Sequence, residues 1–258
     1  MNLKRLQNRW AASLATKVET CAALLRQRRP LNEPEVHDLR VALRRARMLA
    51  DVGARTLGRT RTRRFRKAAR TMLDALDRLR DCDVALDWLQ QAGAPAATMN
   101  LLKRRRTRLW KMAQRQFKPQ AMELGEIPAG EKPAAKKMAA RLDDHLAAVT
   151  RQALKTVQRA PEIPIAELHK LRRVVRRWRY LRELQLAPRE IRRDRRLKTL
   201  IRVQESLGAL QNDDVILAQL KSMGRVKKLP QLQAGLRSQF THHHREALQQ
   251  ITELPGLL

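Results

Sequence analysis

Two stretches of the sequence carry the same unusual pattern and restrict the folds that are open to the chain. They read HDLRVALRRARMLAD at residues 37–51 and HKLRRVVRRWRYLRE at residues 169–183. At about 100° per residue, each forms a helix with a histidine and arginines on one side and apolar residues on the other. The expected apolar sides are Leu39, Ala42, Leu43, Ala46, Leu49 and Ala50 in the first helix, and Leu171, Val174, Val175, Trp178 and Leu181 in the second. The same projection assigns Val41, Met48 and Tyr180 to the basic sides.

The arginine rows are unfavourable for an isolated helix. Arg40 and Arg44 are four residues apart, as are Arg172 and Arg176, and each like-charge pair at this spacing destabilises a helix by roughly 0.2–0.5 kcal/mol. Almost no Asp or Glu lies on the same face. One such row is typical of an ordinary solvated surface, but two rows with the same spacing indicate an anionic ligand.

A second pair of motifs indicates an internal duplication. LRDCDV at residues 79–84 and LQNDDV at residues 210–215 are 131 positions apart, whereas the arginine helices are 132 positions apart. A drift of one residue over this length is typical of a repeat. No stretch alternates with period two at strand length, so we predict an all-α fold. Within one domain spanning 1–258, we expect a first helical bundle at 1–118, a linker at 119–133 and a second bundle at 134–258.

The expected helices follow the same order in both halves. An opening helix at 2–28 corresponds to one at about 134–158, and each precedes an arginine helix, ending near residue 56 or 186. A basic helix then ends near Leu79 or Leu210, and Asp81 is the expected N-cap of a short helix to residue 91, matched by one ending at 222. The closing helices are expected at about 97–116 and 229–252.

Composition favours a polyanionic partner. Lys and Arg total 56 against 25 Asp and Glu, which gives a net charge of +31. Arginine outnumbers lysine, and its planar fork binds phosphate oxygens in pairs. Only 3% of residues are aromatic, which disfavours a single-strand binder that stacks bases. The two cysteines form no CxxC pair and no secretory leader or membrane-spanning run is evident, so a cytoplasmic protein is expected.

The doubled histidine–arginine helices, each followed by a basic helix and then RDCDV or QNDDV, resemble the CHAD family of helical domains with conserved histidines. The resemblance implies two pseudo-symmetric bundles that bind inorganic polyphosphate along a central basic groove, without catalysis or cofactor, and sometimes at polyphosphate granules. By this match the groove would be lined by His37, Arg40, Arg44, Arg45 and Arg47, and by His169, Arg172, Arg176, Arg177 and Arg179. The helical projection adds Arg173 to the basic side of the second helix. Arg64, Lys67, Arg195 and Lys198 are further candidates, because they point away from the core side of their helices. The triphosphatase motif ExExK that accompanies some members is absent, since Glu33 and Glu35 are followed by Val36 and His37.

Other interpretations remain open from the residues alone. A basic nucleic-acid-binding protein has the same charge. An enzyme acting on polyphosphate or nucleotides would need a metal site such as Asp81, Asp83, Asp213 and Asp214 offer. We favour helix capping and arginine pairing for these aspartates. The run His242–His244 lies within a helix, where consecutive residues point about 100° apart, so a solvated face is expected there.

Overall fold

The computed structural model describes residues 2–27, 29–54, 57–125, 134–160, 162–223 and 229–257. Over these residues the chain is all α-helical, as the sequence predicts, with nine α-helices, one short 3-10 helix and no strand. The helices are α1 (Leu3–Leu25), α2 (Glu33–Val52), α3 (Arg59–Gln91), α4 (Ala96–Gly125), α5 (Ala135–Val157), α6 (Ile165–Gln185), α7 (Pro188–Ile191), α8 (Arg195–Ser222) and α9 (Leu229–Ile251). No helix among the described residues has an apolar stretch long enough to cross a membrane.

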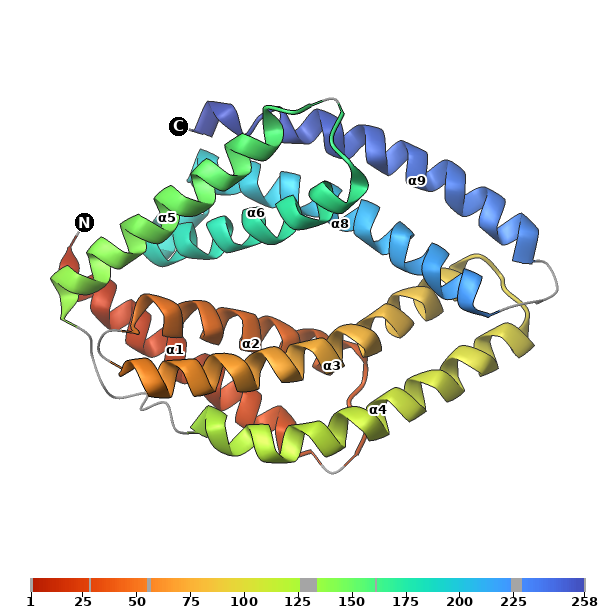
Figure 1. Cartoon of the computed structure of the whole chain (residues 1–258), viewed down its shortest axis with the longest axis horizontal. Coiled ribbons are helices and arrows are strands. Elements are labelled where there is room, and N and C mark those ends of the chain that lie inside the picture. The colour runs from red at the N-terminus through yellow and green to blue at the C-terminus, as the bar shows by residue number, and fades with distance from the viewer. Residues whose placement is uncertain are drawn as a thin grey trace. The chain divides into compact units, whose positions relative to one another are not determined.

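The chain divides into two compact units, Met1–Ala140 and Arg141–Leu258, here called unit 1 and unit 2. In unit 1, α2 packs between α1 and α3, and α3 packs along α4 (Figure 1). In unit 2, α8 packs between α6 and α9, and a hydrogen bond of 3.2 Å from Arg177 to His145 Nδ1 links α6 to α5. The boundary between the units falls inside α5, after the first six residues of this helix.

The core of unit 1 fixes the orientation of α2. Trp10 of α1 is fully buried, and its indole N–H donates to the carbonyl of Leu49 at 2.8 Å. Gly53, directly after α2, makes room for this ring, because a Cβ at that position would lie 2.2 Å from Trp10 Cζ2. The predicted apolar side of α2 is buried throughout, so the arginine side is turned away from this core.

The start of α2 is specified locally. The Asn32 side chain accepts a hydrogen bond from the backbone N–H of Glu35, and the Glu35 carboxylate accepts one from the backbone N–H of Asn32. This reciprocal capping box, together with Pro34 in the first turn, fixes the first residue of the helix. Residues 32–35 therefore set where α2 begins.

The predicted break at the aspartate motifs is wrong. Helix α3 runs without interruption through Arg80–Asp83, and α8 runs through Gln211–Asp214, so neither motif caps a helix. Residues 59–91 contain no Gly or Pro to stop the helix. Aspartate is tolerated in a helix interior where its carboxylate has a partner, as Asp83 has in Arg106.

Helix α4 also extends beyond its expected end at residue 116. It continues through Pro119 to Gly125, although a proline removes one helical hydrogen bond. Phe117 and Leu124 are both buried, and the Phe117 ring meets that of Trp110 edge-on at 6.1 Å. Tertiary packing therefore carries the helix into the first part of the predicted linker, of which residues 126–133 lie outside the described residues.

Candidate anion-binding site

The basic side of α2 carries its arginines against α3. Arg40 donates from Nε and from a terminal nitrogen to Asp77 Oδ1, at 2.9 and 2.7 Å, and Arg44 donates to the same oxygen at 2.8 Å. The side chains of Arg40 and Arg44 are only 12% and 17% exposed, whereas that of Asp77 is 46% exposed. Two guanidinium groups thus share one carboxylate, which holds both in fixed positions.

His37 begins this face and is exposed. Partial burial, and then the positive charges of Arg80 and Arg40, lower the pKa of His37 below 6.5, while Asp38 opposes the shift. This shift favours the neutral imidazole, which can donate one N–H to an anion. Arg80, whose charge contributes, is itself paired with Glu33 at the start of α2.

The remaining candidates of unit 1 lie where the sequence predicts a polar surface. Arg45 and Arg47 are half-buried on α2, and Arg64 and Lys67 are exposed near the start of α3. The candidates of this unit therefore come from two helices that run side by side (Figure 1).

The basic side of α6 in unit 2 has a different set of partners. His169 Nε2 lies 3.0 Å from Asp214 Oδ2 on α8, so this histidine is held by a carboxylate. Arg179 donates to Glu183 one turn later at 2.8 Å, and its guanidinium carbon lies 5.7 Å from the ring centre of Tyr180. Arg172 lies against Gly208 of α8, where a Cβ would be 3.5 Å from Arg172 Nε.

The other candidates of unit 2 differ in exposure. Arg176 and Arg177 are half-buried on α6, whereas Arg173 is exposed. Arg195 and Lys198 are exposed in the first turn of α8. The candidates outside the arginine helices are therefore exposed, as the sequence predicts. They are Arg64 and Lys67 in α3, and Arg195 and Lys198 in α8.

Met48 and Tyr180 do not lie on the basic surfaces to which the helical projection assigns them. Both are buried, each 8% exposed, and they occupy equivalent positions eleven residues after His37 and His169. In α2, Leu49, Ala50 and Val52 beyond Met48 are also buried. The basic face of α2 therefore ends about one turn before the helix does.

The aspartates of the two motifs are engaged in hydrogen bonds. Asp83, 3% exposed, accepts from Arg106 Nε of α4 at 2.5 Å. Asp213 accepts from Gln239 at 3.0 Å and lies 2.6 Å from His243 Nδ1. Arginine pairing is therefore confirmed for Asp83, while His243, expected on a solvated face, instead binds a buried aspartate. In the described part of the chain, no three His, Cys, Asp or Glu side chains converge in a way that suits a metal ion.

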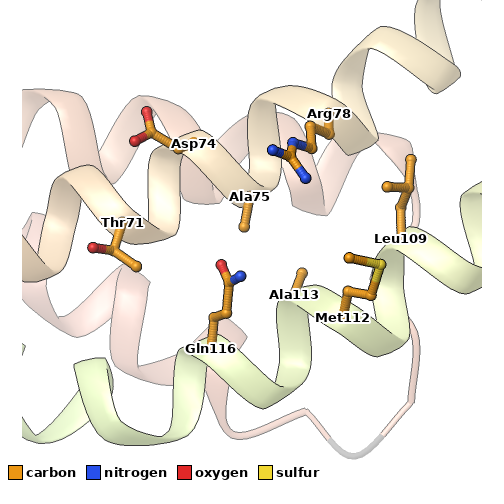
Figure 2. Close-up of a pocket in the computed structure, with 8 residues that line it drawn as sticks. All are labelled: Thr71, Asp74, Ala75, Arg78, Leu109, Met112, Ala113 and Gln116. Atoms are coloured by element: carbon orange, nitrogen blue, oxygen red, sulfur yellow. The ribbon is translucent and has the colours of Figure 1, made fainter.

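A separate hollow of about 230 Å³ lies between α3 and α4. Figure 2 shows its lining, which is largely apolar on the α4 side and includes Asp74 and Arg78 on the α3 side. One acid and one base give this hollow no net preference for an anion. It contains none of the candidate residues predicted from the sequence.

Several residues that shape the two faces were not predicted. No sequence pattern distinguishes Asp77, Arg106 and His145. Each contacts an arginine or aspartate that lies on another helix, 23 to 37 positions away in the sequence. Of the three, only Asp77 could be singled out from the repeat. When the two copies of the repeat are aligned, the position equivalent to Asp77 is Gly208.

The fold and the paired histidine–arginine helices define an all-α protein with one basic helix face in each of two compact units. A family profile for the CHAD domain matches residues 14–221, and the chain belongs to the CHAD family. Among solved structures, it is similar to PptA from Streptomyces chartreusis, with a TM-score of 0.65, 18% identity, and coverage of 96% of this chain and 99% of that one. It is also similar to the CHAD domain from the plant Ricinus communis, with a TM-score of 0.61, 17% identity, and coverage of 98% and 90%. A search of curated protein sequences found no match.

Proposed function

We propose that the chain binds inorganic polyphosphate, without catalysis, through the basic faces of α2 and α6 acting as two sides of one groove. The observation that carries this proposal is the repetition of one histidine–arginine row on the equivalent helix of each unit. The family to which the chain belongs supports the choice of polymer. Through that polymer, the protein would associate with polyphosphate granules in the cytoplasm.

The chemistry of the two faces suits a linear polymer of phosphates. From His37 to Arg47 the helix rises about 15 Å at 1.5 Å per residue, so basic groups follow one another along several phosphoryl units. Arginine donates paired hydrogen bonds to phosphate oxygens. Arg40 and Arg44 are also held in place before binding by their hydrogen bonds to Asp77, which reduces the entropy lost on binding.

The engaged aspartates support a binding role over a catalytic one. Asp83, Asp213 and Asp214 contact Arg106, His243 and His169 respectively. A divalent ion would have to displace these cationic or hydrogen-bonding partners. If the proposal is correct, pure protein with Mg²⁺ releases no phosphate from the polymer, and release that is lost in Asp83→Asn would contradict it.

The polymer itself is tested by competition. Labelled long-chain polyphosphate and labelled duplex DNA are offered together at about 0.15 M salt, where charges beyond roughly 8 Å are screened. We expect polyphosphate to be retained, with an affinity that falls steeply as salt is raised. Preferential retention of DNA would instead identify a nucleic-acid-binding protein.

The location of the site is tested by neutral substitutions on both faces. In Arg44→Gln combined with Arg176→Gln, each side chain keeps an N–H donor but loses its charge. A hydrogen bond to a charged group contributes about 1.5–3 kcal/mol, so losing two should weaken binding at least about 100-fold. The matched control is Lys111→Gln with Arg245→Gln, which removes the same charge from exposed positions on α4 and α9. Equal losses in both double variants would exclude these faces as the site.

A further inference from the structure

The hollow between α3 and α4 is a short groove that follows both helices. Each helix contributes four lining residues at the spacing i, i+3, i+4 and i+7, which is the spacing of one helix face. Figure 2 shows Ala75 of α3 and Ala113 of α4 between the longer side chains, so small residues leave the space open. A groove between two packed helices accepts the row of side chains of a third helix.

The apolar side of this groove is open to solvent. Met112 of α4 is 50% exposed, the highest value among the large apolar side chains that the structure describes as exposed. Leu101 is also exposed, and eleven residues of helix place it within about 20° of Met112 around the axis of α4. Exposed apolar side chains beside a hollow are typical of a binding surface, and methionine adapts well to the shape of a partner.

The α4 border of the groove is positively charged. Arg108 and Arg115 are exposed, and they lie four residues before and three residues after Met112. No Asp or Glu occurs between Ala96 and Met122, so this part of α4 has no acid of its own to offset the charge. Like charges at this spacing destabilise a helix, which favours an acidic counterpart from outside it.

The α3 border of the groove is also positive on balance. Asp74 lies 3.9 Å from Arg70, so these two charges offset one another, and Arg78 adds a further positive charge to the lining. A molecule that fills the groove therefore needs apolar groups for its centre and acidic groups for its borders.

Unit 2 contains a segment of this chemistry at the equivalent position. Arg202 of α8 lies 131 positions after Thr71, the offset that relates the two repeats, and it pairs with Glu253 at 2.6 Å. Leu254 and Leu257, which follow this glutamate, are both buried. An acidic segment with buried leucines thus joins α8 at this position, whereas in unit 1 Thr71 lines the open hollow.

We propose that the groove between α3 and α4 is a docking site for an acidic amphipathic helix of a partner protein. The apolar side chains of that helix fill the hollow beside Met112, and its acidic side chains pair with Arg78, Arg108 and Arg115. Polyphosphate has no apolar groups to fill the hollow, so this site is distinct from the basic faces of α2 and α6. The proposal is independent of the polymer that those faces bind.

A synthetic peptide tests the proposal. It has about 18 residues, or five helical turns, with Leu at positions i, i+3, i+4 and i+7 and Glu on both sides of this row. A second peptide has the same composition in scrambled order, because a chain with a net charge of +31 attracts acidic peptides in general. Binding to the full chain is measured by fluorescence anisotropy at about 0.15 M salt. We expect saturable one-to-one binding that is at least about tenfold tighter for the amphipathic peptide.

A substitution in the hollow locates the bound peptide. Met112→Glu brings a charge into the apolar centre of the groove and should weaken peptide binding at least about tenfold. The matched control is Leu3→Glu, the same kind of change at an exposed apolar position of α1, which should leave binding unchanged. Circular dichroism confirms the helix content of both variants.

Substitutions on the α4 border give a second measurement. Arg108→Gln with Arg115→Gln removes two charges and should weaken binding about twofold to tenfold, with a smaller dependence on salt. The matched control is Arg237→Gln with Arg245→Gln, which removes the same charge from exposed positions on α9. An equal loss in the two double variants would show that the peptide responds only to the net charge, and the proposal would be overturned.

The remaining outcomes identify other occupants. Equal affinity for the two peptides, or equal losses in Met112→Glu and Leu3→Glu, overturns the proposal. So does binding to vesicles that contain phosphatidylserine, lost in Met112→Glu, if the peptide itself does not bind, because the occupant is then a lipid surface. Met112→Glu should leave the affinity for polyphosphate unchanged, and a parallel loss would place the hollow within the polyphosphate site. Failure of the wild-type protein to bind polyphosphate would refute only the proposed function.

Discussion

Replacing Arg106 should show how unit 1 holds the start of its basic face. Arg106 of α4 donates from Nε to the buried Asp83 of α3 and from a terminal nitrogen to the carbonyl of Leu31 at 2.9 Å, just before α2 begins. In Arg106→Met, the Asp83 carboxylate would remain 97% shielded from water without its cationic partner. Removing one member of a buried ion pair destabilises a protein by about 3–5 kcal/mol, a large share of the 5–15 kcal/mol that is usual for the whole fold.

The pH dependence of this loss follows from the state of Asp83. Burial raises the pKa of Asp83 above 3.8, and Arg106 opposes this shift. Without Arg106 the pKa rises further, so the folded variant binds a proton that the unfolded chain releases. The free energy of unfolding of the variant therefore increases as pH falls, and its deficit relative to wild type should be largest near pH 8 and smaller near pH 5.

Guanidinium denaturation followed by tryptophan fluorescence measures this effect. Trp10, Trp88 and Trp110 lie in unit 1 and one tryptophan lies in unit 2, so the signal mainly reports the unit that is changed. Arg104→Met, at an exposed position on the same helix, should alter stability by less than about 0.5 kcal/mol. Asp83→Leu with Arg106→Met removes both charges and should recover most of the loss. A loss below about 1 kcal/mol that is equal at both pH values would refute the reasoning.

Three further predictions concern single residues. Gly53→Ala should destabilise the chain by about 1–3 kcal/mol in denaturation experiments because its Cβ would overlap the Trp10 ring, whereas Gly235→Ala, with open space around it, should stabilise α9 by about 0.5–1 kcal/mol. Burial, followed by the charge of Asp77, raises the pKa of Asp81 from 3.8 to about 6, so the folded chain loses stability as pH rises from about 4 to 6; Asp81→Asn should therefore raise the melting temperature at pH 8 and leave it unchanged at pH 4. Both thiols are buried and burial raises the pKa of Cys21 to about 12, so a disulfide reagent should react with the folded chain far more slowly than with the denatured chain.

The sequence predicts the helix faces well where the evidence is periodic and local. The apolar sides of α2 and α6 are buried as expected, and the capped start of α2 follows from Asn32, Pro34 and Glu35. The same reasoning fails at Met48 and Tyr180, because a helical projection describes one helix and does not include the elements that pack against it. It also fails at Pro119, where the buried Phe117 continues a helix that local propensity would end.

The partners of the arginines could not be predicted, because they depend on how α3 and α8 are turned against their neighbours. Asp77 is one acid among several on a long basic helix, and only packing brings it to Arg40 and Arg44. Likewise, His243 and Asp213 are 30 residues apart and meet only when α8 and α9 pack. The groove that the resemblance implies stays a prediction, with the binding experiments as its test.

Comparing the repeats with one another strengthens the case for an external anion. Arg40, Arg44, Arg45 and Arg47 recur as arginines at the equivalent positions of α6, whereas the carboxylate that holds two of them in unit 1 is replaced by Gly208 in unit 2. If the arginines of both units served mainly to pair with an acid at this one position, its replacement by glycine should leave those of unit 2 open to substitution by neutral residues. The guanidinium rows are instead the constant element, and the acid at this position is the variable one. A ligand supplied from outside the chain explains why the arginines recur and the acid does not. Such a ligand would require the arginines on each face, but it would not depend on how each unit holds them in place.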